Sequence, residues 1–228
     1  MRQTLGLSRC PIAVIFCKRP PKGVPKFAGN VPSGCSFFGI AAGGMTFYTV
    51  AADHYCCPIG SYTWNLPLPV NHAKEMARSI DSLSGTCNIS LEAIQSIPRS
   101  QNNPNLVVFS PLENTPMDPD VVVLVVKPLQ GMIIQEAAMR KHIGVHIAPL
   151  SQPTCMSLHY VMEDKAVTTA GCMGNRVFNA LKEEEMYMLL PGRLLQKVAD
   201  ELQNIATANS KLAEQYLQKR SDIEALLI

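Results

Sequence analysis

The sequence predicts an α/β protein, with a mixed sheet built from two similar halves and a helical segment at the C-terminal end. Short runs of β-branched and apolar residues alternate along the chain with longer segments whose apolar residues recur at helical spacing. The run that opens the first half, Pro11-Ile-Ala-Val-Ile-Phe, resembles the one that opens the second, Pro119-Asp-Val-Val-Val-Leu. With 228 residues and 47% hydrophobic content, the chain can bury a core of ordinary size.

Short segments rich in β-branched or apolar residues are predicted to be strands. In chain order they span residues 11–17, 46–52, 106–109, 121–126, 166–170 and 186–190. Helices are predicted at 71–83, 90–97 and 129–142, followed by a long helical pair from residue 193 onward. Pro191-Gly192 marks the turn before this last segment. Its apolar residues then follow the helical period: Leu194, Leu195, Val198, Leu202 and Ile205. We expect this helix to pack on the sheet.

The stretch 96–119 contains five prolines among polar residues, a composition typical of a connector. We therefore place a boundary near residue 115, between a first half at 1–115 and a second half at 116–228. Both halves run in the same order: strand, cysteine-headed segment, strand, cysteine–glycine turn. This shared order predicts an internal duplication.

Charge and hydropathy exclude two classes of partner. Twenty basic and eighteen acidic residues give a formal charge of +2, and no long basic run is present, so nucleic acid is not an expected partner. The apolar run 11–17 is too short to span a bilayer, so no membrane association is expected. Eight cysteines without a secretion signal predict a cytoplasmic protein whose thiols serve metal binding or redox chemistry rather than disulfides.

Four cysteines stand at matching places in the two halves and predict a common site. Cys35 and Cys57 bracket a short segment and a strand in the first half, and Cys155 and Cys172 do so in the second. Thiolates suit iron–sulfur clusters, zinc and copper(I), and neither pair has the tight spacing of a zinc ribbon. Four sulfurs that converge from two related units favour a [4Fe–4S] cluster, with zinc as an alternative. The adjacent Cys56 leaves open which residue of the Cys56-Cys57 pair is the ligand.

Other uses of these residues stay open. His54 and His159 lie near the cysteines in sequence and are candidates for a mixed site or for axial ligation of haem or another tetrapyrrole. A thiol-dependent enzyme or ligand-binding protein is the rival interpretation, and an assembly subunit without a metal is a third. Phosphate-loop, serine-hydrolase and zinc-protease motifs are absent from the sequence, so these reactions lack their usual residues.

Several motifs together resemble the uncharacterised ArCR domain-of-unknown-function family of archaea and anaerobic bacteria. They are Pro11-Ile-Ala-Val, Cys35, Cys56-Cys57-Pro-Ile-Gly60, Pro119-Asp-Val-Val-Val, Gly171-Cys-Met-Gly-Asn-Arg176 and Glu185-Met-Tyr-Met-Leu-Leu-Pro-Gly192. The resemblance covers nearly the whole chain and implies a cytosolic protein of anaerobic metabolism with cysteine-bearing motifs. It implies no particular reaction.

The string Gly-Cys-x-Gly-x-Arg is the most specific of these motifs, and it carries Gly174 and Arg176 beside Cys172. A glycine next to a ligand lets backbone N–H groups approach cluster sulfides. Arg176 is expected to offset the negative charge of a cluster or to bind a small anionic ligand. A redox partner protein and a homo-oligomer are the other partners that we consider.

Overall fold

The computed structural model describes residues 1–54, 59–67, 92, 96, 99, 102–148 and 153–225. Its described strands form one seven-stranded mixed sheet in the order β2-β3-β1-β4-β7-β6-β5. The strands are β1 (Ile12–Cys17), β2 (Phe47–Thr49), β3 (Leu106–Pro111), β4 (Val121–Val126), β5 (Gly144–Ile147), β6 (Lys165–Thr169) and β7 (Met186–Pro191). Only β5 and β6 pair in parallel; the other neighbours are antiparallel. The predicted α/β class is confirmed.

The helices are mostly short. The α-helices are α1 (Arg2–Leu5), α2 (Ser36–Ala42), α3 (Ile59–Thr63), α6 (Pro128–Arg140), α7 (Thr154–Met162), α8 (Met173–Phe178) and α9 (Leu195–Glu224). Short 3-10 turns are η1 (Ala51–His54), η2 (Leu112–Asn114) and η3 (Gly192–Leu194). The predicted helix at 129–142 is α6. The helix predicted at 71–83 lies outside the described residues, as does most of 90–97.

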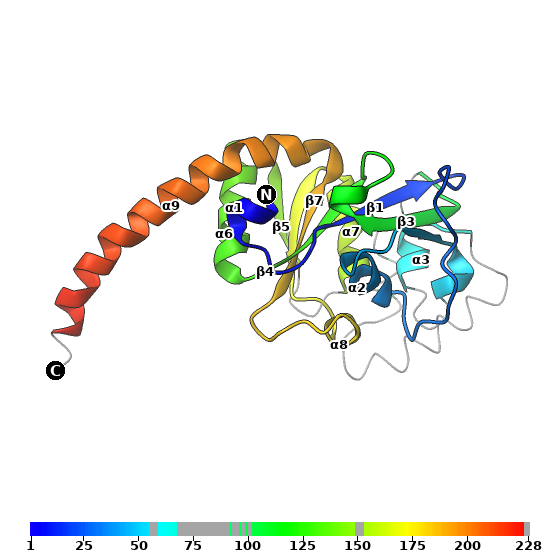
Figure 1. Cartoon of the computed structure of the whole chain (residues 1–228), viewed down its shortest axis with the longest axis horizontal. Coiled ribbons are helices and arrows are strands. Elements are labelled where there is room, and N and C mark those ends of the chain that lie inside the picture. Colours follow the sequence, from blue (N-terminus) through cyan, green and yellow to red (C-terminus); the bar gives the residue numbers. More distant parts are fainter. Residues whose placement is uncertain are drawn as a thin grey trace.

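The predicted C-terminal pair of helices is wrong, because α9 runs unbroken over 30 residues. No glycine or proline follows Gly192 in the sequence, so no residue there breaks the helix. Its first part packs on the sheet as expected, and its second part projects away from the body of the molecule (Figure 1).

The two faces of the sheet are covered by different helices because the strands alternate their side chains. On one face, Val121, Val123 and Tyr187 pack with the helices α2, α3 and α7. On the other face, Val122, Leu124 and Leu190 pack with α1, α6 and α9. All six residues of β4 are buried, as expected for a central strand with helices on both sides. The helix that follows Cys35, α2, and the helix that contains Cys155, α7, therefore lie on the same face.

The strands on the two sides of the central β1–β4 pair are paired in a similar order. β1 pairs with β3 and β3 with β2; β4 pairs with β7 and β7 with β6, all antiparallel. In the second half, α6, β5 and α9 have no counterpart among the described residues of the first half. The internal duplication therefore stays a prediction. The β1–β4 pairing joins the halves on either side of residue 115 into one sheet.

Candidate functional site

Cys35 and Cys172 are brought together from the two halves of the chain. Cys35 is the residue before α2, and Cys172 is the residue before α8. Their thiols lie close enough to form a hydrogen bond with each other. Cys35 is 5% exposed, and Cys172 is partly buried against the apolar cluster that α2, α3 and α7 share. None of the described cysteines forms a disulfide.

The environment of Cys172 favours its neutral thiol. The hydrogen bond with Cys35 raises the pKa of Cys172 far above its usual range, and burial and the charge of Cys35 act in the same direction. The backbone N–H groups of Asn175 and Gly174 oppose this shift and lower the pKa of Cys172. The folded protein therefore holds Cys172 as a neutral thiol at neutral pH.

Two asparagines connect the helices around the sulfur pair. Asn179 follows α8, and its Nδ2 donates to the carbonyl of Cys35 at 3.0 Å and to the carbonyl of Asn175 at 2.8 Å. Asn175 is fully buried in α8, and its Oδ1 accepts a hydrogen bond from Thr154 Oγ1 of α7 at 3.1 Å. These bonds hold the starts of α2, α7 and α8 in one arrangement.

Buried polar atoms without partners gather around the same two cysteines. Within the described part of the chain, four such atoms lack a hydrogen bond there: Ser36 Oγ, Asn175 Nδ2, Asn179 Oδ1 and the Tyr187 hydroxyl. Tyr187 is fully buried in β7. Burial raises the pKa of Tyr187, and the charges of Cys35 and Cys172 act in the same direction. Its phenol is therefore a neutral donor near the two sulfurs. Buried polar groups are normally hydrogen-bonded, so this cluster is a candidate binding site.

Cys155 lies on the same face of the sheet, in the first turn of α7. It is 5% exposed, and its carbonyl accepts a hydrogen bond from Trp64 Nε1 at 2.9 Å. A Cβ placed on Gly60 of α3 would lie 3.3 Å from the Cβ of Cys155, so Cys155 packs closely on α3. Its neighbour Thr154 contacts Asn175 beside Cys172. Cys57, with Cys56, lies outside the described residues.

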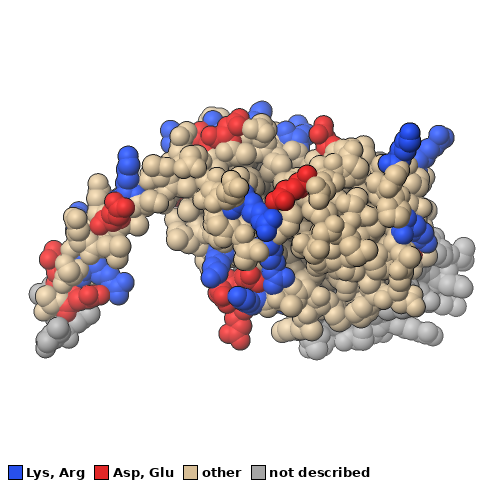
Figure 2. Space-filling view, in the orientation of Figure 1, with Lys and Arg blue, Asp and Glu red and all other residues tan. Residues whose placement is uncertain are grey.

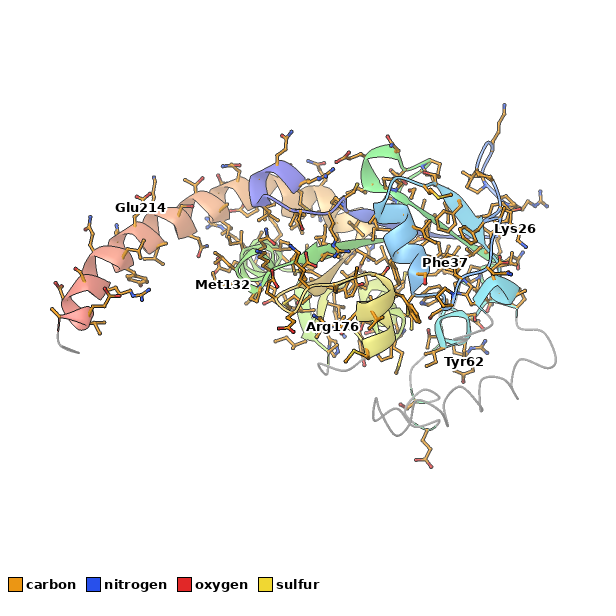
Figure 3. The ribbon with its side chains drawn as sticks, turned by 60° about the horizontal axis from the view of Figure 1, so that its bottom comes forward. Lys26, Phe37, Tyr62, Met132, Arg176 and Glu214 are labelled. Atoms are coloured by element: carbon orange, nitrogen blue, oxygen red, sulfur yellow. The ribbon has the colours of Figure 1, made fainter. Side chains whose placement is uncertain are left out.

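Arg176 is engaged by the backbone of its own half. Its guanidinium donates to the carbonyls of Ala170 at 3.0 Å and Glu185 at 2.9 Å, and to those of Lys182 and Glu183. Figure 3 shows Arg176 on α8, close to α2 with Phe37. This geometry clamps the loop between α8 and β7. Gly174, in the first turn of α8, directs its N–H toward Cys172. Anion binding by Arg176 stays a prediction.

The two candidate histidines have structural partners. His54 is 1% exposed, its Nε2 lies 3.0 Å from Thr49 Oγ1, and its ring contacts Phe37 and Trp64. His159 Nε2 lies 3.1 Å from Glu163 Oε1, one helical turn along α7. Over the described ranges, no group of three or more His, Cys, Asp or Glu residues is placed to hold a metal ion. Cys35 and Cys172 form a two-sulfur pair without a third described ligand.

The comparison with protein families agrees with the cysteine-bearing motifs. The model of DUF169, an uncharacterised family designated ArCR, matches residues 1–201 and so includes Cys35, Cys155 and Cys172. The chain belongs to the ArCR family. The matched region of this ArCR protein ends just after the start of α9.

A relative of this ArCR protein is an uncharacterised protein from Methanocaldococcus jannaschii, 26% identical over 117 residues. The match covers 50% of each chain, so this chain spans about half of the relative that it matches. No solved structure was found to match the ArCR protein. In the described part of the chain, no helix is both long and apolar enough to cross a membrane.

Reasoning from the sequence missed four contributors to the ArCR site: Arg9, Asn175, Asn179 and Tyr187. Arg9 donates to the carbonyl of Asn179 at 2.6 Å and pairs with Glu185 at 3.1 Å. Period-two alternation along β7 puts Tyr187 and Leu189 on the cysteine-bearing face, a signal that the sequence contains. Asn179 carries no comparable signal, because its contact with Cys35 depends on how α8 packs against α2.

Proposed function

We propose that this ArCR protein binds a metal ion or an iron–sulfur cluster through cysteine thiolates, with Cys35 and Cys172 as its first two ligands. The observation that carries the proposal is the contact between these two thiols, set among buried polar atoms that have no partner. Soft thiolate ligands select zinc, copper(I) and iron–sulfur clusters. In an ArCR protein, we place this chemistry in anaerobic redox or cofactor metabolism in the reducing cytosol.

The residues around the pair fit such a group. A bound cation would offset the effects that disfavour the Cys172 thiolate, since thiol ligands lose their protons on metal binding. The N–H groups of Gly174 and Asn175 and the hydroxyl of Tyr187 would donate toward the sulfurs, which tunes a cluster's reduction potential. Cys155 on the same face, together with Cys57, would complete a set of four. The partners that we propose for such a site are a redox partner protein or a small anionic ligand.

Anaerobic purification followed by iron, zinc and acid-labile sulfide analysis tests the proposal directly. We expect a brown protein with metal in stoichiometric amount. Cys35→Ser and Cys172→Ser should lose that metal. The matched control is Cys17→Ser, because Cys17 ends β1 in a separate apolar cluster and should leave the metal content unchanged. A colourless, metal-free wild-type protein would reject metal binding by this pair.

A second function is favoured by the absence of a third ligand near the pair among the described residues. Cys35 and Cys172 would then work as a dithiol. Each thiol loses a proton, the two sulfurs form one bond, and two electrons pass to a disulfide or quinone oxidant. Mass spectrometry under non-reducing conditions, after exposure to oxidised glutathione, should find a Cys35–Cys172 disulfide in a metal-free protein. A protein that keeps its metal and forms no such disulfide would exclude this alternative.

A further inference from the structure

The helix α9 carries an apolar stripe along its whole length, and only the first part of the stripe is covered. Leu202 and Ile205 are 1% and 7% exposed and pack into the core. Leu212, Tyr216 and Ile223 continue the stripe but are 43%, 58% and 59% exposed. Figure 1 shows why: α9 leaves the body of the molecule and runs on alone.

The stripe has a seven-residue period. Leu202, Tyr216 and Ile223 stand at one position of this period, with the polar Asn209 between them. Ile205 and Leu212 occupy the intermediate position, which Lys219 takes in the last repeat. This spacing packs one helix against another in a left-handed coiled coil. In the covered part the partner is α6, which shares the apolar cluster of Leu202 and Ile205. The exposed part has the same period and therefore also fits a helix.

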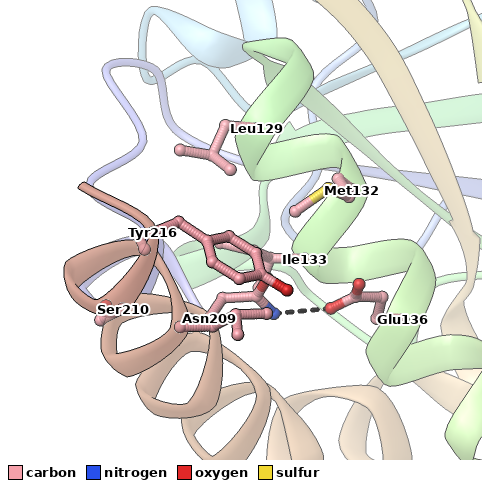
Figure 4. A pocket seen from close by; sticks show the side chains of 9 residues that line it. Leu129, Met132, Ile133, Glu136, Asn209, Ser210 and Tyr216 are labelled. Carbon is pink, nitrogen blue, oxygen red and sulfur yellow. Dashed lines mark hydrogen bonds between the residues drawn. The ribbon is translucent and has the colours of Figure 1, made fainter. Parts of the chain in front are cut away.

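A groove opens where α9 diverges from α6. Its volume is about 430 Å³, and its apolar lining includes Leu129 and Met132 of α6 and Leu212 and Tyr216 of α9. Leu129 and Met132 are themselves 63% and 41% exposed. Figure 4 shows the Tyr216 ring over the gap between the helices. At the inner end, Asn209 Nδ2 donates to Glu136 Oε2 at 2.6 Å and closes the α6–α9 contact.

We propose that a second copy of this chain fills the groove with the projecting end of its own α9, in a two-fold symmetric dimer. The groove and the projecting stripe belong to one molecule. In a dimer with a two-fold axis, the stripe of each copy therefore covers the groove of the other.

The exposed area is close to what a stable dimer needs. The exposed apolar side chains of this surface are Leu129, Met132, Leu212, Tyr216 and Ile223. At about 100 Å² each, they offer roughly 500 Å² per protomer before polar atoms are counted. Two copies together then reach the total of about 1,000 Å² that marks a specific interface. Figure 2 shows both signs of charge along the projecting helix, so no single-sign repulsion opposes self-association there.

This surface is separate from the cysteine pair. It lies on the α6 and α9 side of the sheet, and the exposed part of α9 follows residue 201, where the family match ends. Dimerisation and metal binding can therefore be measured independently, and either can fail without the other.

Light scattering coupled to size-exclusion chromatography tests the dimer on the 228-residue chain at about 50 µM, where a dimer with a dissociation constant of about 1 µM or lower is mostly assembled. We expect twice the 24.9 kDa chain mass for the wild type. Tyr216→Glu on α9 and Met132→Glu on α6 should each give the monomer with unchanged helical circular dichroism and thiol or metal content. Gln218→Glu, an exposed change outside the stripe, should leave the dimer intact.

Two sites on different helices guard against a local folding defect in either variant. A monomeric wild type would overturn the proposal. So would a dimer that survives both glutamate substitutions, because its contact would then lie elsewhere on the molecule.

Discussion

At the scale of single residues, Cys172 shows how one sulfur changes the acidity of another. The usual pKa of a cysteine thiol is 9.0, and the Cys35 hydrogen bond and burial raise the pKa of Cys172 above it in the folded protein. Above pH 9, the unfolded chain therefore releases this proton while the folded chain retains it. The stabilisation is complete below pH 9 and is lost as the pH rises through the folded value.

We therefore predict that the metal-free protein loses stability in mildly alkaline solution. Urea unfolding between about pH 8 and pH 10.5 should show a falling free energy of unfolding, with a smaller slope in Cys172→Ala. Identical slopes in the two proteins would contradict the assigned environment of Cys172.

Arg176 and Cys172 belong to the same short motif. The sequence indicated the neighbour of Cys172 but not the neighbours of Arg176. It marked both as site residues, and in the structure Cys172 lies beside Cys35. It could not reveal that the Arg176 guanidinium meets four carbonyl groups, because these belong to loop residues whose path depends on tertiary packing. The sequence shows that Arg176 carries a positive charge, but it does not show which acceptor groups the guanidinium contacts.

At the scale of secondary-structure elements, the contact between α2 and α8 sets the distance between the two sulfurs. Gly39 of α2 faces Asn179, and a Cβ at Gly39 would lie 2.6 Å from Asn179 Oδ1. Asn179 cannot easily move aside, because its amide nitrogen holds the carbonyls of Cys35 and Asn175. The absence of a side chain at Gly39 therefore permits the close approach of these helices.

Gly39→Ala should lower the free energy of unfolding by about 1–3 kcal/mol because it overpacks this contact. It should also reduce the metal content or the yield of the Cys35–Cys172 disulfide. The control is Gly131→Ala in α6, where the added Cβ would lie 3.5 Å from Val126 Cγ2, an ordinary contact. That change should stabilise by up to about 1 kcal/mol, since alanine favours helix. Urea unfolding compares the two, and equal effects would refute the steric argument.

Most elements were predictable where their pattern is local. The apolar runs gave six of the strands and α6, and Pro191-Gly192 correctly marked the turn before the last helix. The structure adds the reason for this glycine: a Cβ at Gly192 would lie 1.7 Å from the Pro119 carbonyl oxygen. Short α2, α7 and α8 were not predicted as such, because helices of one or two turns depend on tertiary packing rather than on periodicity.

At the scale of the whole molecule, Asp120 joins the two halves at the centre of the sheet. Its Oδ2 accepts the N–H of Phe16 at 2.7 Å, and its own N–H donates to the Val14 carbonyl at 3.1 Å. Its carbonyl accepts the N–H of Gly192 at 2.9 Å. Burial raises the pKa of Asp120, although the bond from Phe16 opposes that shift. The negative charge of Asp120 thus destabilises the folded protein, whereas its Oδ2 stabilises the fold by accepting the Phe16 N–H.

Asp120→Asn should accordingly keep or slightly raise stability at pH 7, because the amide oxygen still accepts from Phe16. Asp120→Ala should lose about 1–2 kcal/mol, because the part-buried N–H of Phe16 is left without a partner. Thermal or urea unfolding distinguishes the two variants. Because the pKa of Asp120 is raised in the folded protein, the free energy of unfolding of the wild type should rise relative to that of Asp120→Asn as the pH falls toward 4. Equal losses in both variants would show that the charge itself is stabilising.

The distance in sequence between Cys35 and Cys172 also imposes an order on the maturation of the protein. Cys35 leaves the ribosome while α8 and β7 are still to be synthesised, so a half-made chain exposes one sulfur and no pair. Any cofactor or oxidant that requires both sulfurs must act after translation has passed β7. Occupation of the site would then report that both halves have been made and joined, which makes it a natural marker of the mature protein.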